Sequence, residues 1–170
     1  MNKKTVVSVD SLTSIDEHLD ELSDLLIEVV DQGASVGFLP PLNRHEAQTY
    51  WKSVVNSETV LFVARIKDQI VGTVQLQLAS KQNGLHRAEI AKLMTHPNFR
   101  RLGIAQSLMR SAEERAIGEG RTLLVLDTRD GDPSNQLYLS LGYQYAGQIP
   151  NYALSTNGKY HSTNFYYKNL

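Results

Sequence analysis

The chain has 170 residues, a length that suits one domain with a full hydrophobic core. Apolar residues make up 41% and charged residues 21%, the balance of a globular protein rather than a disordered one. A formal net charge of −1 gives no global field for nucleic acid or an anionic membrane. The absence of cysteine excludes from this chain a disulfide framework, a thiolate metal site and a cysteine nucleophile.

Hydropathy gives no sign of membrane insertion or export. No apolar run approaches the length that spans a bilayer, and residues 1–5 lack the apolar stretch of a signal peptide. We therefore expect one cytoplasmic domain over residues 1–170.

The first elements are a strand and a helix. Residues 5–9 are rich in β-branched side chains and predict a short strand. Ser14 and Glu17 have the spacing of a capping box, and apolar residues recur after them at helical spacing. This pattern predicts an amphipathic helix that ends near Gly33.

A loop and a second helix follow. Residues 33–41 have no clear periodicity, and their glycines and prolines predict a loop. Phe38 and Leu39 are apolar for a solvated loop, so we expect this loop to cover another part of the molecule. Asn43, with Glu46 three residues later, predicts the next helix start.

Three strands are expected next, over 59–67, 70–79 and about 85–95. Asp68-Gln69 is the candidate turn between the first two, and Asn83-Gly84 is a turn signal before the third. In the second strand, alternation places on one face the apolar residues Ile70, Val74, Leu76 and Leu78.

The remaining pattern predicts a long helix over about 101–118, a short apolar strand over 122–126, a helix begun by Asp132-Pro133, and strands at about 143–148 and 163–168. The long helix has an apolar stripe formed by Leu102, Ala105, Leu108, Met109, Ala112 and Ala116.

The order of these elements predicts the fold class. A strand, helix and strand over 85–127 form a crossover, which requires a parallel pair, whereas the other connections favour antiparallel hairpins. We expect an α/β (α+β) fold, with a mixed, mostly antiparallel sheet of about seven strands, one central parallel pair, and helices on both faces.

The segment Arg100-Arg101-Leu102-Gly103-Ile104-Ala105 lies between a predicted strand and helix. Such a turn offers backbone N–H groups and the positive end of the helix dipole to an anion, and two small residues allow close approach. The two arginines add donors suited to phosphate. The chemistry indicated is pyrophosphate binding; the alternative is a helix start with two solvated arginines.

The pattern Arg-x-x-Gly-x-Ala resembles the acetyl-CoA loop of the GNAT acetyltransferases, and it follows a strand that ends Lys92-Leu93-Met94-Thr95. The second landmark of that family is similar to Asn135-x-x-Tyr138-x-x-Leu141-Gly142-Tyr143. The resemblance covers nearly the whole chain. It implies the GNAT fold and an acetyl-CoA-dependent acyltransferase that acetylates nitrogen or oxygen of a small-molecule acceptor.

Other segments resemble the tabtoxin-resistance acetyltransferases. They are Gly33-Ala34-Ser35-Val36-Gly37-Phe38, Asn83-Gly84-Leu85, Arg87-Ala88-Glu89, Lys92-Leu93-Met94, Leu126-Asp127-Thr128, and the tail through Pro150, Tyr152, Gly158 and His161. This narrower resemblance implies an amino-acid-like β-lactam toxin as the acceptor, and hence detoxification or resistance.

Three side chains are the candidate catalytic groups. The resemblance implies that Tyr138 protonates the departing thiolate; the alternative is a core tyrosine. Glu89 is placed by alternation beside Ala91 and Leu93, where burial would raise its pKa and suit a general base; the alternative is a surface ion pair. Asp127 ends the apolar strand, where ligands gather in such sheets, and could hold a cationic acceptor or share the base role; the alternative is a helix-capping or loop aspartate.

The resemblance also implies two sets of binding residues. Cofactor-binding positions are Leu93, Met94, Thr95, Arg100, Arg101, Leu102, Gly103, Ile104, Ala105, Asn135 and Tyr138, with backbone N–H groups near Met94 stabilising the oxyanion. Acceptor-binding positions are Ser35, Val36, Phe38, Asp127 and Tyr152, with His161 as a further candidate; ordinary loop packing is the alternative. The five histidines show no paired metal-ligand spacing, so we expect no metal.

Other functions remain open. A peptide N-terminus, a polyamine or an aminoglycoside could be the acceptor, although polycations need an acidic site and the acidic residues cluster in the first helix. A non-catalytic acyl-CoA-binding module is the alternative from another class. We expect no nucleic-acid or membrane partner, and the resemblance is compatible with a homodimer.

Overall fold

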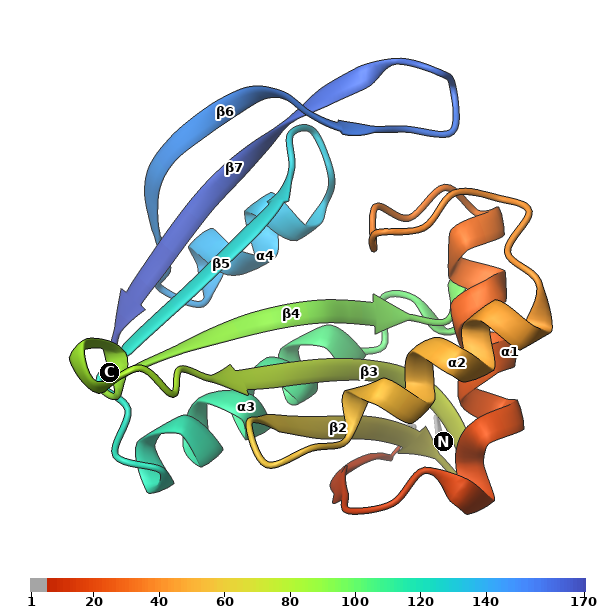
Figure 1. The fold of residues 1–170 in the computed structure, drawn as a ribbon, viewed down its shortest axis with the longest axis horizontal. Helices are drawn as coiled ribbons and strands as arrows, with labels where there is room; N and C mark the ends of the chain where they lie inside the picture. Colours follow the sequence, from red (N-terminus) through yellow and green to blue (C-terminus); the bar gives the residue numbers. More distant parts are fainter. Residues whose placement is uncertain (1–5) are drawn as a thin grey trace, which may run out of the picture.

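The computed structural model describes residues 6–170, so Thr5 of the first predicted strand lies outside the described residues. A seven-stranded sheet has the order β1-β2-β3-β4-β5-β7-β6 (Figure 1). Its strands are β1 (Val7–Leu12), β2 (Thr59–Ile66), β3 (Gln69–Leu78), β4 (Arg87–Thr95), β5 (Leu123–Arg129), β6 (Gln144–Leu154) and β7 (Tyr160–Asn169). Its helices are α1 (Leu19–Asp31), α2 (Arg44–Val54), α3 (Ile104–Gly118) and α4 (Ser134–Ser140).

The predicted fold class is confirmed. Within residues 6–170, only β4 and β5 pair in parallel, and the other neighbours in the sheet are antiparallel. Helices α1 and α2 pack on one face over a core that includes Leu26, Trp51 and Leu61, and α3 packs on the other with Leu108 and Leu124. No helix in residues 6–170 is long and apolar enough to cross a membrane.

The two N-terminal helices begin differently. The Asn43 capping box is confirmed, because the Asn43 side chain accepts from the Glu46 N–H at 2.9 Å and the Glu46 carboxylate accepts from the Asn43 N–H at 3.3 Å. The prediction of a capping box at Ser14 is wrong. The Ser14 hydroxyl instead bonds to Asp16, a short 3₁₀ turn follows, and α1 begins only at Leu19.

A bulge in β3 overturns the predicted alternation there. Ala64 faces Gly72 and Arg65 faces Ile70, so Val71 is an extra residue. Ile70 therefore packs beneath α1 and α2, whereas Val74 packs on the opposite face, against the α3 side of the core. The preceding turn is also shifted by one residue, to Lys67-Asp68, with Lys67 at φ 56°.

A second bulge lies in β4. There Val74 of β3 faces two residues of β4, Lys92 and Leu93. Lys92 has φ 53°, an uncommon value for a non-glycine residue. The extra residue turns Leu93 toward the α3 side of the core, so the prediction that Leu93 shares a face with Glu89 is wrong.

The other elements differ from prediction mainly at their ends. Helix α3 begins at Ile104, which is buried, and Leu102 precedes it at 44% exposure, so Leu102 is not part of the buried stripe. The β6–β7 hairpin is longer than predicted and extends close to the Asn157-Gly158 turn. The Asp132 side chain does not cap α4, because it pairs with Arg129.

The parallel pair separates early. Its register contains only Arg87 with Leu123, Ala88 with Leu124, and Glu89 with Val125, after which β4 and β5 diverge (Figure 1). Beyond Glu89, the edge of β4 that faces β5 has no strand partner in the part of the chain that the structure describes. The divergence opens the sheet at its centre and positions the site described next.

Candidate active site

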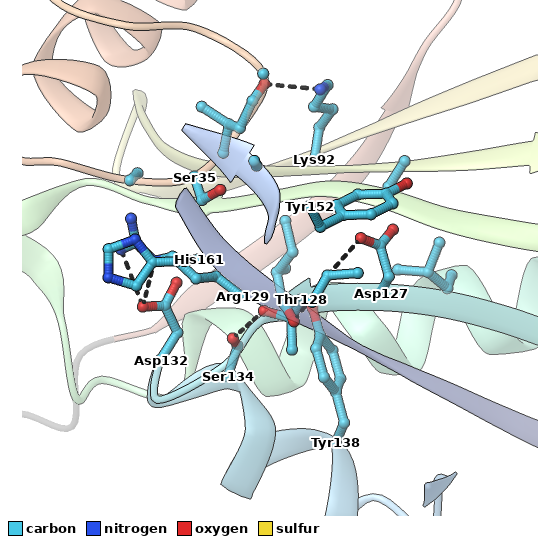
Figure 2. Close-up of a pocket in the computed structure, with 18 of the residues that line it drawn as sticks. Ser35, Lys92, Asp127, Thr128, Arg129, Asp132, Ser134, Tyr138, Tyr152 and His161 are labelled. Carbon is cyan, nitrogen blue, oxygen red and sulfur yellow. Dashed lines mark hydrogen bonds and ion pairs between the residues drawn. The ribbon is translucent and has the colours of Figure 1, made fainter. Parts of the chain in front are cut away.

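A cavity of about 470 Å³ lies beside the point where β4 and β5 separate. Its walls come from the α1–α2 loop, β4, β5, the start of α4 and the β6–β7 hairpin. Seven of the residues predicted to act in catalysis or binding line it, namely Ser35, Val36, Glu89, Leu93, Asp127, Tyr138 and Tyr152, and His161 joins them. Figure 2 shows side chains from these separate segments converging on one space.

Glu89 and Asp127 supply the carboxylates of the cavity. Glu89 keeps contact with solvent, but partial withdrawal from water raises its pKa above the ordinary value, and the Asp127 charge raises it further. Asp127 accepts a hydrogen bond from the Thr163 hydroxyl at 2.8 Å. Within residues 6–170, neither carboxylate forms an ion pair, so the surface ion pair considered for Glu89 is not formed there.

Tyr138 combines a core position with access to the cavity. Its side chain is 5% exposed and packs near Tyr143 and Tyr166, with ring centroids 5.8 and 6.0 Å away. Burial, and after it the charge of Asp127, raises the pKa of the Tyr138 phenol well above its usual range. The phenol is therefore protonated at neutral pH and suited to donate a proton.

Lys92 also lines the cavity, and its role was missed in the sequence. Its ammonium group donates a hydrogen bond to the Val36 carbonyl at 2.7 Å. Alternation from Ala88 and Ile90 would have placed this lysine in the apolar core, which is a detectable sign of a bulge. Burial lowers the pKa of Lys92, while Asp127 and Glu89 partly oppose that shift.

Arg129, a second residue missed in the sequence, ties the cavity walls together. Its guanidinium pairs with Asp132 at 2.9 Å and donates to the Gly33 carbonyl at 3.1 Å and the Ser155 hydroxyl at 3.2 Å. One side chain thus joins the α1–α2 loop, the β5–α4 connection and the β6–β7 turn. Its place at the carboxyl end of a parallel strand was the available signal.

The predicted acceptor residues of the α1–α2 loop divide between two spaces. Ser35 borders the main cavity and an adjoining one of about 240 Å³, whereas Val36 borders only the main cavity. Phe38 borders only the smaller cavity, where it packs edge-on against Tyr50 at 5.1 Å. The expectation that this loop covers another part of the molecule is confirmed.

The Asn135 side chain is held by hydrogen bonds to other parts of the protein. Its amide nitrogen donates to the carbonyls of Arg129 and Asp132 at 2.9 and 2.8 Å, and its amide oxygen accepts from Asn164 and Tyr166 at 3.0 and 2.8 Å. These four bonds order the β5–α4 connection against β7. Asn135 does not line the cavity, and its predicted contact with a cofactor stays a prediction.

The 100–105 segment lies at the N-terminus of α3, away from the cavity lining. Gly103 is the N-cap residue at φ 77°. Among the described residues, no side chain caps the helix, and a Cβ atom at Gly103 would meet nothing within 4 Å. Arg100, Arg101 and Leu102 are exposed. The helix end therefore presents open backbone and two cations to solvent, as an anion site requires.

The end of β4 separates side-chain and backbone roles. The Met94 side chain is 3% exposed and belongs to the core beneath α1 and α2, as expected, and Thr95 pairs with Gly72. Neither lines the cavity, and their predicted backbone contacts stay predictions. Among the residues that the structure describes, no group of three or more histidine and carboxylate side chains could hold a metal ion.

Comparisons with known proteins agree with this fold. Solved structures share the fold: a protein of Acinetobacter baylyi superimposes with a TM-score of 0.86 at 18% identity, covering 100% of this chain and 95% of that one. The protein yncA of Salmonella typhimurium, solved with acetyl-CoA, gives 0.80 at 14% identity, covering 96% and 94%.

Sequence relatives identify the family. An uncharacterized N-acetyltransferase of Azospirillum brasilense is 33% identical over 133 residues, covering 76% of this chain and 78% of that protein. Residues 26–143 match the model of the acetyltransferase (GNAT) family. The chain therefore belongs to the GNAT family of acetyltransferases.

Proposed function

We propose that this protein transfers the acetyl group of acetyl-CoA to an amine or hydroxyl of a small acceptor. The observation that carries the proposal is the placement of Glu89 and Tyr138 in one cavity, where β4 and β5 separate. A base that accepts the acceptor's proton and an acid that returns a proton to sulfur are the two groups this transfer needs.

The residues present fit acetyl-CoA. Open backbone at Gly103 and the exposed side chains of Arg100 and Arg101 match the pyrophosphate, because both helix dipole and guanidinium groups favour that anion. The unpartnered edge of β4 beyond Glu89 offers backbone groups to an extended chain and to the developing oxyanion. When bound, acetyl-CoA supplies an activated thioester.

The proton steps follow from the environments of the two groups. Glu89 accepts the proton that the acceptor loses as it gains the acetyl group, and its raised pKa brings it closer to neutral pH. Tyr138, protonated at that pH, donates its proton to the sulfur as the carbon–sulfur bond breaks. A cysteine acyl-enzyme has no part in the scheme, because the chain has no cysteine.

The acceptor we propose is an amino-acid-like β-lactam toxin, which makes the physiological role detoxification or resistance. The narrower resemblance of 33–38, 83–89 and 126–128 supports this, since Ser35, Val36, Glu89, Asp127 and Thr128 of those segments line the cavity. The lining sets two cationic side chains, Lys92 and Arg129, against its carboxylates, so it lacks the strongly acidic surface that a polyamine or an aminoglycoside would need.

Release of CoA with each acceptor tests the proposal. A thiol reagent reports turnover without interference, because released CoA is the only thiol besides any in the substrates. The panel should hold β-lactam amino acids, free amino acids, dipeptides, polyamines and aminoglycosides. Acceptor-dependent release, highest with a β-lactam amino acid, is expected. Tight acetyl-CoA binding without release for any acceptor would instead favour a non-catalytic binding module.

A further inference from the structure

Lys92 lines the cavity at the β4 bulge, and Figure 2 shows its side chain reaching the α1–α2 loop. Its ammonium nitrogen donates to the Val36 carbonyl at 2.7 Å. The next loop residue is Gly37, at φ 90°, and a Cβ atom there would lie 2.8 Å from the ammonium nitrogen. The loop thus approaches the ammonium group as closely as a glycine permits.

The charged side chains of the cavity are unequally paired. In residues 6–170, Arg129 and Asp132 form an ion pair at 2.9 Å, whereas Lys92, Glu89 and Asp127 form none. Lys92 bonds to a neutral carbonyl, and Asp127 accepts from a neutral hydroxyl. The cavity therefore offers one ammonium group and two carboxylates without ionic partners. His161 adds an imidazole to its lining.

The positive charge of Lys92 is only partly stabilised by its surroundings. Withdrawal from water disfavours its charged form, and the carboxylates of Asp127 and Glu89 only partly restore it. A buried charge gains most from an anion that supplies both charge and hydrogen-bond acceptors. Lysine is suited to such contact because, of its three donors, one can keep its bond to Val36 while the other two turn toward the ligand.

We propose that Lys92 binds a carboxylate of the acceptor, while the acceptor's amine lies at Glu89 and Asp127. The substrates are then amino acids or amino-acid-like compounds with a free amine and a free carboxylate. This inference rests on the proposed acetyl transfer. It deepens that proposal by naming Lys92 as the residue that selects acceptors with a free carboxylate. It also makes Lys92 a determinant of specificity that discriminates an acid from its neutral derivatives.

A purely structural role for Lys92 predicts a different result. If the ammonium group only held the α1–α2 loop through Val36, its loss would weaken all acceptors alike. If it binds the acceptor carboxylate, its loss removes the preference for the acid and leaves the neutral derivative unaffected. The ratio between matched acceptors therefore separates the two roles.

The experiment compares L-amino acids with their α-carboxamides, which keep the amine and side chain but lack the anion. The wild-type protein and Lys92→Gln, Lys92→Arg and Lys159→Gln variants are assayed for kcat/KM by CoA release. The wild type is expected to prefer the acids roughly 10- to 100-fold, the size expected for a charged hydrogen bond. Lys92→Gln should lose that preference, Lys92→Arg should keep most of it, and Lys159→Gln, at an exposed hairpin position, should match the wild type.

Calorimetric binding of the same acceptors in the presence of CoA gives a readout besides turnover. Tighter binding of acids than amides, lost in Lys92→Gln, supports the inference even if the chemistry is slow. Equal treatment of acids and amides by the wild type, or equal losses for both in Lys92→Gln, overturns it. If acetyl-CoA neither binds nor turns over, the proposed function is wrong. If the enzyme is active but treats acids and amides alike, the proposed function stands and only the inference about Lys92 is wrong.

Discussion

Asp127 on β5 and Glu89 on β4 line the same cavity, one on each of the two strands that separate beyond the Glu89–Val125 pair. Partial desolvation raises the pKa of Glu89, and the neighbouring Asp127 charge adds to that rise. The two carboxylates therefore suit different roles. Glu89, whose pKa is raised, suits a general base, and Asp127 supplies a negative charge that adds to that rise. Which of them is the base is a question that titration answers.

Replacing Asp127 with asparagine should move the acidic limb of the pH profile to lower pH. Removing the negative charge withdraws one cause of the raised Glu89 pKa, so Glu89 loses its proton at a lower pH and activity appears earlier as pH rises. The measurement is kcat/KM against pH, with Asp68→Asn in the exposed β2–β3 turn as the control.

The same profile assigns the base. Glu89→Gln should abolish the acidic limb along with most of the activity, by about 100-fold or more. An inactive Asp127→Asn variant beside an active Glu89→Gln variant would transfer the role of base to Asp127.

Replacing Tyr138 with phenylalanine should lower kcat by about 100-fold or more while acetyl-CoA binding is retained. The buried ring keeps its packing near Tyr143 and Tyr166, but the proton donor to sulfur is lost. Turnover is measured by CoA release and binding by calorimetry. Tyr160→Phe, at a tyrosine that is 65% exposed on the hairpin, is the control and should keep full activity. An unchanged kcat in Tyr138→Phe would leave the ring with a packing role alone.

Gly103→Ala should weaken acetyl-CoA binding, and Gly120→Ala should not. Both glycines have positive φ, 77° and 72°, and a Cβ atom at either would meet nothing within 4 Å. Each substitution therefore carries a similar backbone strain, about 1 to 2 kcal/mol of unfolding free energy. Only Gly103 lies at the helix end that we assign to pyrophosphate. Calorimetric Kd values and thermal unfolding of both variants separate strain from ligand contact, and equal Kd values would remove Gly103 from the site.

The order of elements and the central parallel pair could be predicted because each depends on local patterns. Helical spacing, turn residues and the apolar 122–126 strand all lie close together in the chain. The two bulges were missed, although Gly72 beside Val71 and a lysine at a core position of the alternation were local signs of them. The Lys92 contact to Val36 could not be predicted in this way, because it joins residues 56 positions apart.

Site residues follow the same division. Glu89, Asp127 and Tyr138 could be predicted because motifs and strand ends mark their positions, and the structure brings all three to one cavity. Leu102 was wrongly included in the helical stripe, because periodicity does not reveal where a glycine N-cap begins the helix. Arg129 was missed because its partners, Gly33, Asp132 and Ser155, meet only in the folded protein.

Arg129→Gln should raise the KM of the acceptor and leave the KM of acetyl-CoA unchanged. The guanidinium holds the α1–α2 loop to the β6–β7 turn through Gly33 and Ser155, so its loss frees two cavity walls from each other. Because the side chain is largely buried, unfolding free energy should also fall by about 1 to 3 kcal/mol. Arg115→Gln is the matched control, since it removes a more exposed pair with Glu119 on α3. Steady-state kinetics in both substrates and denaturant unfolding check the two effects. A rise in both KM values would indicate general loss of the fold, whereas an unchanged acceptor KM would show that Arg129 stabilises the walls without shaping the acceptor site.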